Sequence, residues 1–328
     1  MPANEKEEDN MRWGKWLWGV GLLALLVWWM EPTLAAEAAA PAGGGQDNMP
    51  WWGWALALFV VTFFLGIVAV LGGVGGGVLF VPIVGGFFFP FHLDFVRGAG
   101  LLVALAGALA AGPGLLKSGM ANLRLALPLA LIASSSAIVG AMMGLALKPQ
   151  VVQICLGVTI LGIVALMWSA KKSERPDVPM ADPISSALAI NGVFYDAASK
   201  QEIDWKVHRT PIGMGLFVII GIMAGMFGLG AGWANVPVLN LVMGAPLKVS
   251  VATSKFMLSI VDTSAAWVYL NQGAVIAMIA IPSILGIMLG SLIGVRLLSR
   301  VNASVVRKVV IIMLLLAGGR ALMKGLGF

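Results

Sequence analysis

Two glycine-rich stretches decide the fold of this chain: GGVGGGVLFVP at residues 72–82 and FGLGAGWANVP at residues 227–237. They superpose at an offset of 155 residues as Gly-x-Gly-x-Gly-x-x-x-Val-Pro, which ends at Pro82 and Pro237. With one residue deleted in the second copy, the match continues at an offset of 154 through the pairs Gly119/Gly273, Pro128/Pro282 and Gly140/Gly294. This ordered series predicts an internal duplication.

The composition is that of an integral membrane protein. Of the 328 residues, 59% are hydrophobic and only 11% are charged, whereas soluble domains carry about 25% charged residues. The 42 glycines and 16 prolines indicate closely packed, interrupted helices, as in transport proteins. A soluble enzyme is excluded.

Metal, disulfide and nucleic-acid chemistry have little support. The chain has one cysteine, Cys155, and two histidines, His92 and His208, so it offers no intramolecular disulfide and no ligand set for a structural zinc. We therefore expect no cofactor. The net charge of +6 is spread over loops, so it reports on topology and does not indicate a nucleic-acid partner.

Apolar segments flank one polar stretch, residues 171–210, with five segments on each side. The segments are residues 51–71, 78–90, 98–116, 125–147 and 151–170, followed by 211–226, 233–245, 250–270, 274–295 and 303–323. They predict an all-α polytopic membrane protein with one repeat at 51–170 and a second at 211–328. An arrangement of four plus four helices, with re-entrant second segments, is the alternative.

Charges predict that the two repeats are inverted. The loop Lys117–Arg124 is basic whereas its counterpart, residues 271–273, is uncharged. The turn at Lys148 has one cation, whereas its counterpart carries Arg296, Arg300, Arg307 and Lys308. Equivalent loops with opposite charge bias are typical of inverted-topology repeats. The linker 171–210 is then cytoplasmic, and its Asn191-Gly192 turn chemistry between alternating runs at 189–207 predicts a small β-hairpin.

The first fifty residues form a separate N-terminal region. The apolar run 16–30 follows Arg12 and Lys15 and is shorter than the roughly 20 residues of a spanning helix, as in a signal peptide. An uncleaved anchor is the alternative. Both interpretations place residues 31–50 outside the cytoplasm.

The glycine-rich breaks are the strongest candidate binding elements. Alternating glycines do not hold a continuous helix well, and irregular backbone survives in a bilayer only when it is buried in protein or lines a wet cavity. Each break followed by a short helix predicts a discontinuous membrane element whose N-terminal end attracts anions. The candidate residues are Gly73, Gly75, Gly76 and Gly77 in the first break and Gly228, Gly230 and Gly232 in the second. Close helix packing is the alternative role.

Ionisable residues inside membrane segments are the second candidate feature. Lys255 and Asp262 are separated by seven residues, or two helical turns, so Lys255 is a candidate anion ligand and Asp262 a candidate proton carrier. The alternative is that Lys255 and Asp262 neutralise each other, or that the Lys255 side chain reaches the membrane–water interface. The remaining candidate donors are Thr253, Ser254, Trp233, Asn235 and Arg97.

The two breaks, the sequence Ala252-Thr253-Ser254 after Pro246, and IPSILGIMLGSLIGVRL at 281–297 resemble the sulfite exporter TauE/SafE family, also called the toluenesulfonate uptake permeases. In that family a proline-led Ala-x-Gly-Thr-Ser occurs in both halves. The first half of this chain instead reads PFHLDFVRGAG at 90–100, and the second has Ala252 at the glycine position and Lys255 directly after Thr-Ser. The resemblance covers about 51–170 and 211–328.

The resemblance implies secondary transport, in either direction, of sulfite or an organosulfonate such as sulfoacetate across the inner membrane. A permease or channel for another small anion, such as a carboxylate, is the alternative. A scaffold is a weaker one, and an intramembrane enzyme has no supporting motif. The expected partners are the bilayer, the small anion and a coupling proton or sodium ion, and a homodimer is left open.

Overall fold

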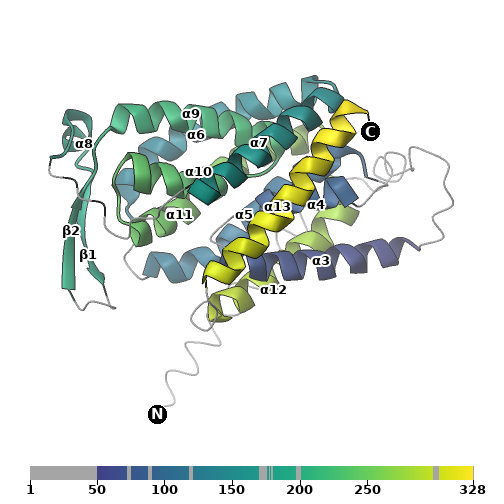
Figure 1. Cartoon of the computed structure of the whole chain (residues 1–328), viewed down its shortest axis with the longest axis horizontal. Helices are drawn as coiled ribbons and strands as arrows, with labels where there is room; N and C mark the ends of the chain where they lie inside the picture. The colour runs from purple at the N-terminus through teal and green to yellow at the C-terminus, as the bar shows by residue number, and fades with distance from the viewer. Residues whose placement is uncertain are drawn as a thin grey trace, which may run out of the picture.

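The computed structural model describes residues 50–71, 75–87, 91–117, 121–169, 176, 178, 180–196, 201–297 and 303–327. The predicted N-terminal signal or anchor and Gly73 lie outside these residues. The first half contains α3 (Trp51–Leu71), α4 (Gly76–Phe87), α5 (Leu93–Lys117), α6 (Leu123–Ala146) and α7 (Pro149–Ser169) (Figure 1). The second contains α9 (Thr210–Phe227), α10 (Gly232–Pro237), the π-helix η1 (Val238–Val242), α11 (Leu247–Asn271), α12 (Ala277–Leu297) and α13 (Ala303–Leu326). With α10 and η1 taken as one interrupted segment, each half has five helical segments among the described residues, in the order that the sequence predicted.

Five of these helices are long and apolar enough to cross a membrane: Trp51–Val70, Leu93–Ala110, Leu123–Ala146, Thr210–Phe227 and Ala277–Gly294. Large apolar side chains such as Phe64, Leu131 and Leu316 are exposed on the outside of the bundle. Such a surface suits contact with lipid and not with water. The chain is a multi-pass membrane protein.

Glycines allow two pairs of helices to pack with their backbones in contact. A Cβ added to Gly290 of α12 would lie 2.0 Å from the carbonyl oxygen of Phe63 in α3. A Cβ added to Gly225 of α9 would lie 2.0 Å from the carbonyl oxygen of Ala137 in α6. Close packing through small residues therefore holds α3 on α12 and α6 on α9. In both pairs the contacting residue numbers increase together along the two helices, so the paired helices run parallel.

Helices at equivalent places in the two halves run antiparallel where they touch. The guanidinium of Arg97, in the second turn of α5, lies over the ring of Tyr269 near the end of α11, 5.8 Å from its centroid. A Cβ on Gly157 of α7 would touch Leu322 of α13, and one on Gly325 would touch Ile154. Figure 1 shows α7 and α13 side by side.

The linker forms the predicted hairpin. Strands β1 (Asn191–Asp196) and β2 (Gln201–Lys206) are antiparallel, with Asn191 opposite Lys206. Before them, the short helix α8 (Pro183–Ala187) begins after Asp182, which accepts hydrogen bonds from Ser185 and Thr210. Partial burial raises the pKa of Asp182, but these hydrogen bonds outweigh that effect and hold the pKa below its usual value.

The linker contacts both halves at one end of the bundle. The side-chain amide of Asn122, before α6, donates to the carbonyl oxygen of Asn191 over 3.3 Å. The backbone N–H of His208 donates to the carbonyl of Met243, which follows η1, over 3.0 Å. The hairpin is thus tied to the start of α6 and to the end of the second short helix.

Candidate functional site

The two glycine-rich breaks meet inside the bundle. A Cβ added to Gly232 would lie 3.1 Å from the Cα of Gly75 and 3.2 Å from its nitrogen. Since α4 begins at Gly76 and α10 at Gly232, the N-terminal ends of both short helices face this junction. Helix α10 continues directly into η1, so the second segment covers Gly232–Val242. Helix N-termini carry free N–H groups and partial positive charge, so two such ends lie close together here.

The second break lies along α5. Gly228 and Gly230 adopt left-handed φ values of 68° and 70°, which side chains other than glycine adopt only with strain. A Cβ on Gly100 of α5 would lie 2.7 Å from the carbonyl oxygen of Gly228. One on Gly77 of α4 would lie 2.6 Å from the carbonyl oxygen of Leu229. Backbone of α4, of α5 and of the break therefore meets with no space for side chains.

Asp262 of α11 places a carboxylate at this break. Its side chain is fully buried, and a Cβ on Gly230 would lie 2.9 Å from Oδ2. The backbone N–H of Ala231 faces the carboxylate, yet neither oxygen has a full hydrogen bond to any described residue. Lys255, two turns earlier on the same helix, is half-buried and interacts with Asp262 electrostatically. The described residues contain no direct ion pair between these two.

Other buried polar atoms near the start of α10 also lack partners. The indole nitrogen of Trp233 and both side-chain polar atoms of Asn235 are buried and have no hydrogen bond within the described ranges. Unpartnered buried donors are costly and point to a polar ligand or water. Both residues were predicted as donors.

Thr253 and Ser254 lie nearer the linker. The hydroxyl oxygen of Thr253 accepts the backbone N–H of Asn122 over 3.2 Å, so it fixes the start of α6. Ser254 is 2% exposed. At the positions equivalent to Thr253, Ser254 and Asp262, helix α5 has Ala99, Gly100 and Ala108. At these three positions only α11 carries polar side chains.

Arg97 lies apart from the junction and is held by the protein. Its Nη1 donates to the carbonyl oxygens of Met226, over 2.8 Å, and Gly144, over 3.1 Å, and its Nη2 binds the carboxylate of Asp94. Tyr269 donates its hydroxyl to the carbonyl of Gly225 over 3.0 Å. Arg97, predicted as an oxyanion ligand, here neutralises the C-terminal ends of α6 and α9, just before the second break.

Two further cations, which sequence analysis missed as site elements, stabilise the other end of α4. Arg320 donates to the carbonyl of Gly86 over 2.6 Å, and Lys324 to that of Gly85 over 3.1 Å. Cations at a helix C-terminus interact favourably with its dipole. No local pattern could have revealed this contact, because 234 and 239 residues separate the partners.

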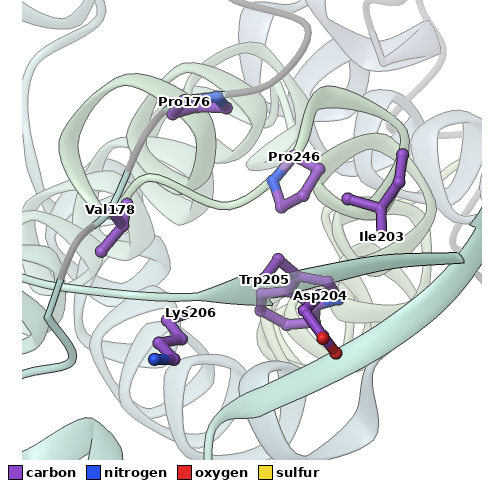
Figure 2. A pocket seen from close by; sticks show the side chains of 7 residues that line it. All are labelled: Pro176, Val178, Ile203, Asp204, Trp205, Lys206 and Pro246. Carbon is purple, nitrogen blue, oxygen red and sulfur yellow. The ribbon is translucent and has the colours of Figure 1, made fainter.

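Two cavities stand out among the described residues, and one of about 280 Å³ lies at the linker. Figure 2 shows its lining side chains, which come from β2, from the segment before α8 and from the start of α11: Pro176, Val178, Ile203, Asp204, Trp205, Lys206 and Pro246. The second cavity is only about 10 Å³ and lies between α4, α7 and α13. Neither is lined by Gly75 or Gly232.

Comparison with known proteins identifies the family. The family model of the sulfite exporter TauE/SafE matches residues 58–321. The chain belongs to the sulfite exporter TauE/SafE family. The match includes both breaks and the two central helices α5 and α11, as the resemblance of the motifs predicted.

A curated relative agrees with this membership. The chain is 24% identical over 280 residues to the "Probable membrane transporter protein YunE" of Bacillus subtilis (strain 168), a match that covers 82% of this chain and 98% of that protein. No solved structure matches the chain. This TauE/SafE protein is thus a multi-pass membrane transporter.

Proposed function

We propose that this TauE/SafE protein is a secondary transporter, not an enzyme, that moves a small sulfur-containing anion, sulfite or an organosulfonate, by alternating access. The observation that carries the proposal is the meeting of two helix N-termini, at Gly75 and Gly232, inside a membrane bundle. Paired positive helix ends at the bilayer midplane are a recurring way to hold an anionic group.

The chemistry around the junction suits an oxyanion. Sulfite and sulfonates present three oxygens, which accept hydrogen bonds from backbone N–H groups and from the unpartnered donors of Trp233 and Asn235. Lys255 supplies a positive charge, and Ser254 a hydroxyl. Thr253 and Arg97 hold the surrounding helices in place. Uphill transport is coupled to an ion through Asp262.

Alternating access follows from an inverted repeat, which the helix directions support. If residues 51–170 and 211–328 are inverted copies, the equivalent pairs α5/α11 and α7/α13 must run antiparallel where they cross, as the contacts of Arg97 and Gly157 indicate. The same inversion relates the pair α3/α12 to the pair α9/α6. Both pairs must then have the same relative direction, and both are parallel. In such a molecule each half takes the other's conformation to open the site to the opposite side.

Uptake into proteoliposomes tests the function. Purified protein should accumulate labelled sulfite or sulfoacetate more than empty vesicles do, and Lys255→Ala should reduce the initial rate by at least tenfold. The matched control is Lys248→Ala, which removes an exposed lysine from the first turn of the same helix and should leave uptake unchanged. Selective uptake of acetate or another carboxylate, without any sulfur anion, would contradict the proposed substrate.

A further inference from the structure

A carboxyl group of the protein itself lies beside the junction of the breaks. The Asp262 carboxylate lies against the backbone of Gly230 and faces the N–H of Ala231, one residue before the helix that starts at Gly232. It is fully buried, and both oxygens lack a full hydrogen-bond partner in the described structure. A buried carboxyl group without fixed partners is costly to keep charged, so its charge depends on what else occupies the site.

We propose that Asp262 is the resident anion of the transport site, and that a substrate anion replaces it there only when Asp262 takes up a proton. The inference rests on the proposed function, because it names the protein group that competes with the substrate anion for the same junction. When the site is empty, the carboxylate neutralises the helix ends and Lys255. When substrate arrives, one proton from solution converts the carboxylate to a neutral acid, and the substrate charge takes its place.

The charge balance favours this exchange. Inside a bundle, two anions at one junction repel each other strongly, since little water screens them. With Asp262 ionised, its negative charge balances the positive charge of Lys255. With Asp262 protonated and the substrate bound, the substrate's negative charge balances Lys255 instead. The site thus carries the same net charge before and after binding, and each anion is accompanied by one proton.

Asp262 is the titratable group placed to do this. Among the described side chains, α4, α9, α10 and η1 bring no titratable group to it. Arg97 and Asp94 lie two turns or more along α5 from Ala104, which contacts Gly230, and they bind each other. Arg124 is exposed about three turns before Ser134, the residue of α6 that meets Ser264.

The remaining neighbours are on its own helix. Tyr269 lies two turns further along α11 and donates its hydroxyl to the carbonyl of Gly225. Lys255 is the nearby cation.

The test is the pH dependence of anion binding, measured by calorimetry with methanesulfonate, which stays ionised at every working pH. Wild-type protein should bind it about tenfold more weakly for each pH unit above the point where binding levels off, because the bound state holds one more proton. Titrations in two buffers of different ionisation enthalpy should show uptake of one proton per anion.

Asp262→Asn provides the decisive comparison. It should bind methanesulfonate with no pH dependence and without proton uptake, and more tightly than wild type at high pH. Thr263→Ala, the neighbouring exposed residue whose hydroxyl bonds its own helix, should behave as wild type. If Asp262→Asn loses binding while it stays folded, or if wild-type binding is independent of pH without proton uptake, the resident-anion proposal is wrong. The buffer comparison on wild type decides the same question if the variant does not fold.

Nitrate, which is also permanently ionised, separates this proposal from the proposed function. If methanesulfonate binds without pH dependence, the substrate class stands and the resident anion is wrong. If nitrate alone binds, with one proton taken up, the resident anion stands and the sulfur-anion assignment is wrong. If neither anion binds either protein between pH 5 and pH 9, both proposals are wrong.

Discussion

Replacing Gly77 with alanine should separate the two breaks. A methyl group there would lie 2.6 Å from the carbonyl oxygen of Leu229, 2.9 Å from that of Gly100 and 3.0 Å from the Cβ of Ala104. Ordinary contacts begin at 3.4 Å, so α4 must move by several tenths of an ångström away from the second break. Both oxygens belong to backbone, which cannot rotate aside as a side chain can.

The magnitude follows from two opposing effects. Forcing an extra methyl group into packed structure costs about 1–3 kcal/mol, and the rigid backbone neighbours place Gly77 near the upper limit. Against this, alanine gains up to about 1 kcal/mol over glycine in a helix, and Gly77 lies in the first turn of α4. The expected net loss of unfolding free energy is therefore about 2 kcal/mol. Transport should fall further than stability, because the displaced half-helix no longer faces its partner.

Gly75→Ala is the matched control. Its Cβ would meet the Cα of Gly232 at 3.6 Å, an ordinary contact, and the residue precedes α4. Its stability should stay within about 0.5 kcal/mol of wild type, the usual range where no packing is disturbed. Equilibrium unfolding in mixed micelles compares the stability of both variants, and initial uptake rates in vesicles compare Gly77→Ala with wild type. A Gly77→Ala protein as stable and active as wild type, or an equal loss of unfolding free energy in both variants, would refute the packing described for the breaks.

Four other outcomes follow. Arg97→Leu should lower stability by about 3 kcal/mol, because Asp94 is left without its partner and the helix ends at Gly144 and Met226 lose their cation; equal unfolding midpoints would contradict this. Asp182→Ala should cost about 1 kcal/mol at neutral pH through loss of the α8 cap. Because the folded-state pKa of Asp182 is lowered, its carboxylate stabilises the protein above about pH 4 and loses this effect as the pH falls through the folded-state value, so melts of wild type and variant should converge in acid. Asn122→Ala should cost about 1 kcal/mol, since it removes the cap of α6, and faster proteolysis near residue 197 would show that the hairpin has also been released from Asn191. Labels introduced near residues 120 and 272 should react from opposite sides of the membrane, and labelling from one side only would exclude inverted repeats.

Much of the fold was predictable because its signals are local. The apolar segments matched the helices to within a few residues, since length and hydropathy decide membrane helices. The hairpin followed from Asn191-Gly192 and alternation. The interrupted helices followed from alternating glycines, and α4 and α10 begin at glycines within the two motifs.

The roles of individual charged residues were less accessible. Arg97 was predicted as an anion ligand, and one of its partners, Asp94, is local. Its carbonyl partners lie 47 and 129 residues away, and no local pattern reveals which carbonyl ends will reach it. The same holds for Thr253, whose partner Asn122 is 131 residues distant. Glycine permits both close helix packing and an interrupted helix. The sequence alone therefore did not distinguish the glycines at the α3/α12 and α6/α9 contacts from those at the breaks.

The most direct test of the account is to locate the anion. Crystals grown with 2-bromoethanesulfonate allow the bromine to be placed by its anomalous scattering. The account predicts a single strong peak beside the junction of Gly75 and Gly232, with the sulfonate against the N–H of Ala231 and the Asp262 side chain moved aside. A peak in the linker cavity at Trp205 and Lys206 instead, with Gly75 still packed on Gly232, would contradict it.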